Sequence, residues 1–247
     1  MPLRKELQWG EITEAQAARL ARLLKLGSEF ATAIEHCSPA RVLRLPAARA
    51  LYETSCVGTQ TDFPLPSGLP RPVDDGAAKH LQGVLLPQVS LASTAGGTVD
   101  LSKLTAPRTV VYCYPMTGVP GQPLPRGWDL IPGARGCTPQ TCGFRNRYPE
   151  ISALSAVVFG LSTQNSHYQR EMATRLELPF EILSDSEFKL CDALHLPTFE
   201  VDGKRLMKRL TLIVRDARIE HVFYPVFPPN ESADEVLHWL KLHPVSI

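Results

Sequence analysis

Apolar and polar positions alternate with two different periods along the chain from about residue 80, and this pattern predicts both strands and helices. The segments that we interpret as strands are short apolar runs, rich in β-branched and aromatic residues and bounded by proline, glycine or aspartate. We expect strands at 85–91, 98–101, 109–114, 157–161, 180–183, 209–214 and 219–224. Between them apolar residues recur at helical spacing, which predicts helices at 139–154, 166–176, 184–194 and 232–243. Pro149 lies inside the first of these and should end or kink it near Tyr148.

The order of these elements predicts the fold class. It reads β-β-β-α-β-α-β-α-β-β-α, in which the β-α-β units indicate parallel crossovers. The strands at 209–214 and 219–224 are joined by a turn at Asp216-Ala217 and should be antiparallel. We therefore expect an α/β fold of the thioredoxin-like sandwich type, with a central mixed sheet flanked by helices and a β-hairpin at its N-terminal side.

The first part of the chain differs from the rest in composition. Residues 1–58 predict a short helical extension, in which Thr13 and Gln16 form a capping box ahead of a leucine stripe. This segment is basic, so one interpretation is a small module that binds a partner or nucleic acid. The other, which we favour, is a poorly ordered leader, because few large apolar residues are present to build a core. Residues 59–79 are rich in proline and glycine and predict a linker, which leaves 80–247 as the main domain.

The overall charge and hydropathy of the chain narrow the class of protein. The 247 residues carry a formal net charge of +1, so we expect no nucleic-acid partner. A run of ~18 or more apolar residues is absent, which argues against a membrane span. The polar N-terminus does not look like a signal peptide. We therefore expect a cytoplasmic protein whose six cysteines are reduced at rest.

Two cysteines, Cys137 and Cys142, lie five positions apart in the segment GCTPQTCGFR at 136–145. Thr138 and Pro139 predict a helix start, with the threonine as N-cap and the proline at the first helical position. Cys137 then lies just before the first turn, and Cys142 lies inside the helix. The free N–H groups and partial positive charge of a helix N-terminus favour a thiolate, the nucleophilic form of cysteine. Cys137 is therefore a candidate reactive cysteine.

Other roles for this pair have less support. A structural zinc needs about four ligands, and no third Cys or His lies near the pair in sequence, so we expect no metal. Packing of both cysteines in the core remains a further interpretation. On an intact helix five residues rise ~7.5 Å and rotate by ~140°, beyond the ~7 Å Cα separation that a disulfide allows. A bond between Cys137 and Cys142 would therefore require the first turns of the helix to unwind.

The segment at 136–145 resembles the active-site segment of the atypical two-cysteine peroxiredoxins of the Q type, the bacterioferritin comigratory protein-like group. The resemblance spans roughly residues 80–245 and includes the segments at 158–163, 183–185, 209–214 and 219–223. It implies an enzyme that reduces hydrogen peroxide or organic hydroperoxides without a metal or an organic cofactor. A thioredoxin or glutaredoxin-like dithiol is the implied reductant, and the implied assembly is a monomer or a weak homodimer.

The resemblance also implies roles for individual residues. Cys137 matches the peroxidatic cysteine, which attacks a peroxide oxygen and becomes a sulfenic acid. Cys142 matches the resolving cysteine, which condenses with it to an intramolecular disulfide. Arg209 matches the arginine that stabilises the thiolate and orients the peroxide, a task suited to a guanidinium because it stays charged and offers several donors.

The chain departs from the family pattern ahead of Cys137. The family carries a proline seven positions and a threonine three positions before the peroxidatic cysteine, where this chain has Leu130 and Ala134. The simplest alignment places an insertion between Thr117 and Gly136, so that Thr117 still supplies the hydroxyl that contacts peroxide. Thr138 or Arg135 could take over this role instead. Trp128, inside the insertion, could cover the site or anchor the loop.

Two rival functions stay open at this stage. One is a protein dithiol-disulfide oxidoreductase on the same fold, although the usual C-x-x-C spacing is absent. The other is a non-enzymatic redox sensor whose helical leader binds a partner. Cys113, in the central strand, and Cys191, within a helix, are expected to be core residues.

Overall fold

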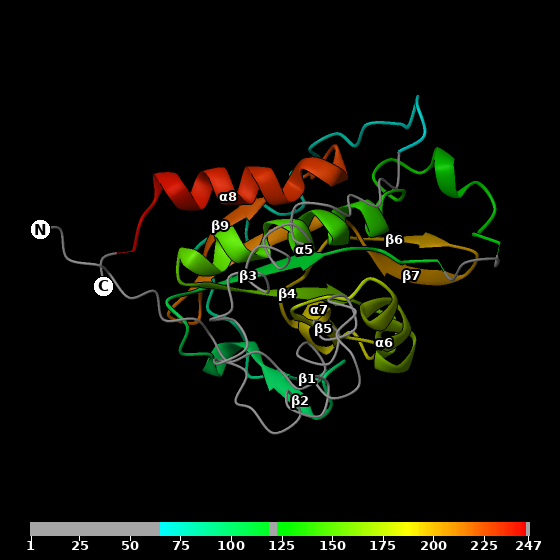
Figure 1. Ribbon diagram of the computed structural model, residues 1–247. Helices are drawn as coiled ribbons and strands as arrows, with labels where there is room; N and C mark the ends of the chain where they lie inside the picture. Colours follow the sequence, from blue (N-terminus) through cyan, green and yellow to red (C-terminus); the bar gives the residue numbers. More distant parts are fainter. Residues whose placement is uncertain (1–64, 119–122, 246–247) are drawn as a thin grey trace, which may run out of the picture. The chain divides into compact units, whose positions relative to one another are not determined.

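The computed structural model describes residues 65–118 and 123–245 (Figure 1). The predicted helical extension at 1–58 and the first residues of the predicted linker lie outside the described residues. The strands are, in chain order, β1 Ser90–Ser93, β2 Thr98–Asp100, β3 Arg108–Cys113, β4 Ala156–Ser162, β5 Glu181–Ser184, β6 Thr198–Val201, β7 Lys204–Met207, β8 Leu210–Arg215 and β9 Arg218–Phe223. The helices are α5 Cys137–Ala153, α6 Ser166–Arg175, α7 Lys189–Ala193 and α8 Ser232–Leu242, with short 3-10 turns η1 Leu101–Lys103, η2 Trp128–Leu130 and η3 Pro229–Glu231.

Seven of the described strands form one mixed sheet in the order β2-β1-β5-β4-β3-β8-β9. Strands β3, β4 and β5 are parallel and are joined by α5 and α6, whereas β8 and β9 form the predicted antiparallel hairpin. The turn of that hairpin has positive φ at both Asp216 (51°) and Ala217 (57°), the geometry that matches the twist of paired strands. The predicted thioredoxin-like sandwich with an N-terminal hairpin is confirmed.

The alternation of side chains along β3 divides the core into two clusters. Val110 and Tyr112 point to the face that packs against α5, α6 and α8. Val111 and Cys113 point to the opposite face, which is covered by α7 and by the segments before β3. Cys113 and Cys191 are fully buried in this second cluster, as predicted. Figure 1 shows α5 and α8 side by side over the sheet.

Helix α5 differs from its prediction at its start and at Pro149. It begins at Cys137, with Gly136 as the N-cap, rather than with Thr138 as the N-cap. Gly136 has φ of +102°, a left-handed conformation that turns the chain sharply into the helix. Pro139 is then the third helical residue, whose missing N–H would have had no partner within the helix. The helix also passes through Pro149 to Ala153, so the proline does not end it.

Two smaller elements also differ from the sequence prediction. A second hairpin, β6–β7, lies outside the main sheet and was not predicted. Its turn, Asp202-Gly203, is a strong hairpin signal that the sequence-based prediction overlooked. Helix α7 begins at Lys189 instead of directly after Ser184-Asp185. Asp185 nevertheless serves this helix, because its carboxylate accepts hydrogen bonds from the backbone N–H of Leu190 and Cys191 (3.2 and 2.7 Å).

The boundaries of the N-terminal hairpin also shift. Its first strand, β1, begins at Ser90 rather than at residue 85. Leu85 instead forms an isolated bridge with Arg218 at the far edge of the sheet. Residues 65–79 contain turns but no helix or strand.

Candidate active site

Cys137 is the first residue of α5 and is almost entirely buried, with 4% of its surface exposed. Its Sγ accepts a hydrogen bond from Nη2 of Arg209 at 3.2 Å. As a thiol it can also donate to the carbonyl oxygen of Ala134, 3.6 Å away. A cationic donor and a helix N-terminus therefore converge on one sulfur.

Arg209 lies directly before β8 and is 3% exposed. Its Nε donates to the carbonyl of Gly133 (3.3 Å), and its Nη2 donates to the carbonyls of Ala134 and Arg135 (both 3.2 Å). Its Nη1 donates to Oε1 of Gln140. The planar guanidinium thus joins the loop before Cys137 to the helix after it, and this leaves little freedom in where it presents its charge.

Gln140 is a residue of this site that the sequence analysis did not identify. It is fully buried on α5, three positions after Cys137, so it lies on the same helical face. Its Oε1 accepts from Arg209, and its Nε2 donates to Oγ of Ser232 at 3.3 Å. A polar side chain one turn after the candidate reactive cysteine was the signal available in the sequence.

Cys142 is also buried, at 5% exposure, inside the continuous helix α5. The cysteines in the described part of the chain, this one included, are free thiols. Burial raises the pKa of the Cys142 thiol, and the positive charges of Arg145 and Arg175 oppose this shift. In the wound helix Cys142 is therefore a poor nucleophile, separated from Cys137 by more than one turn.

Thr117 lies shortly after the end of β3 and is 1% exposed. Its N–H and hydroxyl both donate to Oε1 of Gln164 (2.9 and 3.2 Å), and its carbonyl accepts from the hydroxyl of Tyr168 (2.7 Å). Within the described residues it forms no hydrogen bond with Cys137 or Arg209. Its contact with peroxide stays a prediction.

The inserted segment between Thr117 and Gly136 packs through Trp128, which is 4% exposed. The indole lies 6.2 Å from the ring of Phe199 on β6, in a small cluster with Leu206 of β7. This packing supports the loop-anchor interpretation of Trp128. Arg135 forms an ion pair with Asp129 at 3.2 Å, so its side chain is engaged within the inserted segment.

Residues 65–118 and 123–245 contain neither a candidate metal site nor a candidate membrane-spanning helix. This part of the chain holds no group of three or more His, Cys, Asp or Glu side chains that could bind a metal ion. It also holds no helix long and apolar enough to cross a membrane.

Comparison with known proteins places this geometry in a family. A protein-family model described as Redoxin matches residues 81–237. Peroxiredoxin Bcp of Escherichia coli (strain K12) is 31% identical over 170 residues, which cover 65% of this chain and 96% of the relative. The chloroplastic Peroxiredoxin Q of Gentiana triflora is 26% identical over 181 residues, covering 71% and 76%.

Solved structures agree on the fold. The crystal structure of peroxidoxin BcpB from Mycobacterium tuberculosis superposes with a TM-score of 0.54 at 23% identity, covering 66% of this chain and 98% of that one. Peroxiredoxin Q of Xanthomonas campestris superposes with a TM-score of 0.53 at 23% identity, covering 65% and 98%. The chain therefore belongs to the Redoxin family, in which it is a thiol-dependent peroxidase of the Bcp and peroxiredoxin Q type.

Proposed function

We propose that this peroxidase reduces hydrogen peroxide and organic hydroperoxides through a sulfenic acid on Cys137 and a disulfide between Cys137 and Cys142. The observation that carries the proposal is the 3.2 Å hydrogen bond from Arg209 to the Sγ of Cys137 at the start of α5. It joins the candidate nucleophile to a buried cation, which is the environment of a reactive thiolate.

In the first step the Cys137 thiolate attacks the nearer oxygen of the peroxide. The S–O bond forms as the O–O bond breaks, and the leaving alkoxide or hydroxide takes a proton to become an alcohol or water. The N–H donors of Arg209 lie beside the sulfur, where they stabilise the negative charge that develops on the leaving oxygen. The product is Cys137 sulfenic acid.

In the second step Cys142 attacks the Sγ of the sulfenic acid, and its hydroxyl leaves as water. Because α5 is continuous from Cys137 to Ala153, the first turns of the helix must unwind before the two sulfurs can meet. Unwinding also exposes Cys142 to water, which removes the burial that raises the pKa of its thiol. The same motion therefore brings the two cysteines together and activates the second one.

In the third step an external dithiol of the thioredoxin or glutaredoxin type reduces the disulfide and restores both thiols.

This reduction requires a reducing compartment, and we propose the cytoplasm. The similar proteins named above include a bacterial peroxiredoxin and a plant protein named as chloroplastic. A fluorescent fusion of the full chain, expressed in its native cell, would locate it directly.

The test is peroxide consumption by the full chain in the presence of thioredoxin, thioredoxin reductase and NADPH. We expect Cys137→Ser to abolish turnover, with Cys191→Ser as the matched control that retains it. We expect Cys142→Ser to accumulate a sulfenic acid on Cys137, which dimedone traps, without an intramolecular disulfide.

Mass spectrometry of the oxidised wild-type protein decides the resolving role. A disulfide from Cys137 to Cys113 or Cys191 would contradict the assignment of Cys142. Reduction of insulin disulfides by a chain that does not consume peroxide would instead favour the dithiol-disulfide oxidoreductase, and retained turnover in Cys137→Ser would contradict the assigned nucleophile.

A further inference from the structure

Residues 65–75 lie before the region that matches the Redoxin family and pack against the loop that leads into Cys137. A Cβ placed on Gly136 would lie 2.9 Å from Cδ2 of Leu65, and it would also overlap the ring of Pro229. A Cβ on Gly133 would lie 3.5 Å from Cγ of Pro72. We call residues 65–75 the strap; it is drawn in cyan near the N-terminal end of α8 in Figure 1.

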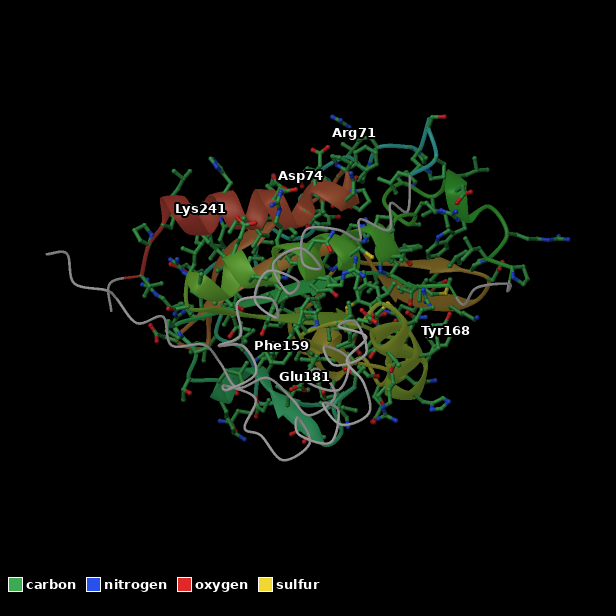
Figure 2. All side chains as sticks on the ribbon, viewed as in Figure 1. Arg71, Asp74, Phe159, Tyr168, Glu181 and Lys241 are labelled. Atoms are coloured by element: carbon green, nitrogen blue, oxygen red, sulfur yellow. The ribbon has the colours of Figure 1, made fainter. Side chains whose placement is uncertain are left out.

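The strap is fastened by polar contacts at its C-terminal end. The carboxylate of Asp75 accepts hydrogen bonds from Nζ of Lys208 (2.6 Å) and from the hydroxyl of Tyr224 (2.7 Å). Lys208 directly precedes Arg209, the residue that contacts Cys137. The guanidinium of Arg71, labelled in Figure 2, stacks 5.3 Å above the ring of Phe227. The strap therefore connects the loop before Cys137 to the segment that carries Arg209.

The strap contacts Gly133 and Gly136, the two glycines at which the loop before Cys137 turns. Gly133 and Gly136 both have positive φ, at 77° and 102°. The backbone carbonyls between them accept hydrogen bonds from Arg209 and so fix its orientation. Unwinding the first turn of α5 has to displace this loop, and Leu65 and Pro72 pack against the loop. Their packing opposes the displacement.

We propose that the strap is a positioning element for Cys137, which holds the first turn of α5 wound and so sets the rate at which the sulfenic acid passes to Cys142. This inference rests on the proposed function. The strap acts after the first oxidation, because attack on peroxide occurs in the wound geometry that the strap supports.

The consequence concerns the fate of the sulfenic acid. It can condense with Cys142 and release water, or it can react with a second peroxide molecule to give a sulfinic acid and an alcohol or water. In the second reaction the sulfur is oxidised and the second O–O bond is broken, so peroxide is the only oxidant needed. A strap that delays unwinding gives the second reaction more time and makes the enzyme more sensitive to excess peroxide.

The experiment compares strap variants of the full chain by rapid quenching. Reduced protein is mixed with hydrogen peroxide, alkylated at set times and analysed by mass spectrometry for the Cys137–Cys142 disulfide and for sulfinic acid. The variants are Asp75→Asn, Leu65→Ala and the double substitution. Each single variant has a matched control: Glu187→Gln disrupts an ion pair to Lys189 (2.9 Å), and Leu130→Ala truncates a leucine that is 80% exposed.

We expect disulfide formation to accelerate by about two- to five-fold in Asp75→Asn, the range that a partly exposed ion pair supports. Leu65→Ala removes apolar contacts and should accelerate it by at least about two-fold. The double variant should be faster still, and its share of sulfinic acid at high peroxide should fall. The controls and the rate of the first oxidation should match the wild type. Hydrogen exchange should rise in the first turn of α5 in the strap variants alone.

The outcomes separate the two proposals. If the wild type forms the Cys137–Cys142 disulfide and the double variant forms it at the same rate, the strap has no positioning role and only this inference is overturned. If the wild type consumes peroxide without forming that disulfide, the proposed resolving step fails and the strap inference fails with it.

Discussion

Arg209 donates hydrogen bonds to several groups at the candidate site in addition to Cys137. Besides the sulfur, its donors reach three backbone carbonyls and the side chain of Gln140. Gln140 is the only side-chain oxygen in that set of acceptors, and it is itself tied to Ser232 at 3.3 Å. At the scale of single residues, we infer that Gln140 decides how the guanidinium is aimed.

Replacing Gln140 with leucine should slow the reaction of Cys137 with peroxide by about ten-fold or more. The change keeps the volume but leaves a buried donor of Arg209 without its acceptor, and a hydrogen bond to a charged group contributes about 1.5–3 kcal/mol. Stopped-flow measurement of peroxide reduction by the pre-reduced protein gives this rate constant. Gln140→Glu keeps an acceptor at the same place and should stay within about three-fold of the wild type. A leucine variant that reacts at the wild-type rate would show that Gln140 does not orient Arg209.

The start of helix α5 depends on Gly136, the residue directly before it. Gly136 combines a φ of +102° with close packing against Leu65 and Pro229, so both the backbone and the space exclude a side chain. This glycine explains why the helix starts at Cys137 instead of Pro139. At the scale of elements, the position of the cysteine on the helix is decided by a glycine outside it.

Gly136→Ala should therefore lower the free energy of unfolding more than an equivalent change at an open position. Gly97 is the matched control, because it has a φ of +69° and a Cβ added there would have no atom within 4 Å. Gly97→Ala should cost about 1–2 kcal/mol from the left-handed backbone alone. Gly136→Ala should cost about 1–3 kcal/mol more from overpacking. Urea unfolding of both variants measures the difference, and equal losses would mean that the strap and η3 yield without cost.

At the scale of the described domain, Arg108 connects three elements that are distant in sequence. It lies at the start of β3 and is 3% exposed. Its Nε and Nη2 donate to the carboxylate of Glu220 on β9 (2.6 and 2.8 Å), and its Nη1 donates to the carbonyl of His243 at the end of α8. Its guanidinium also lies 5.0 Å from the centre of the Trp239 ring. One buried cation thereby holds a central strand, an edge strand and the last helix together.

This arrangement predicts a pH dependence of stability. The hydrogen bond with Arg108 lowers the pKa of Glu220, with partial burial opposing it. A carboxyl whose pKa is lower in the folded state stabilises above its unfolded pKa of about 4.3, and this stabilisation is lost as the pH falls through the folded value. Glu220→Gln should cost about 1.5–3 kcal/mol at pH 7, and the gap to the wild type should narrow in acid. Urea unfolding at neutral and acid pH tests this, with Glu187→Gln as the control; a gap that does not change with pH would refute it.

Much of the fold could be predicted because its elements are strongly periodic. Apolar runs such as Val110-Val111 and the amphipathic pattern of α6 and α8 each belong to one segment, so they can be read without knowledge of the rest. Short elements without such a pattern were missed or misplaced. The β6–β7 hairpin has no strong alternation of apolar residues, and only its turn, Asp202-Gly203, indicates it in the sequence. Helix α5 begins earlier than Thr138-Pro139 predicts, because the left-handed Gly136 is the stronger constraint on its start.

Part of the candidate site could likewise be predicted from local sequence, and part depends on the tertiary structure. From the sequence alone, Cys137 could be placed at a helix N-terminus and Cys142 too far along an intact helix to reach it, because both statements depend only on local geometry. The resemblance to a family then suggested Arg209. Only the tertiary structure brings Arg209 to Cys137 across 72 positions of chain, adds Gln140 as the acceptor between them, and lays the strap at Leu65 against Gly136. Periodicity is a property of one segment, whereas these contacts arise from the packing of a sheet, a helix and two loops against one another.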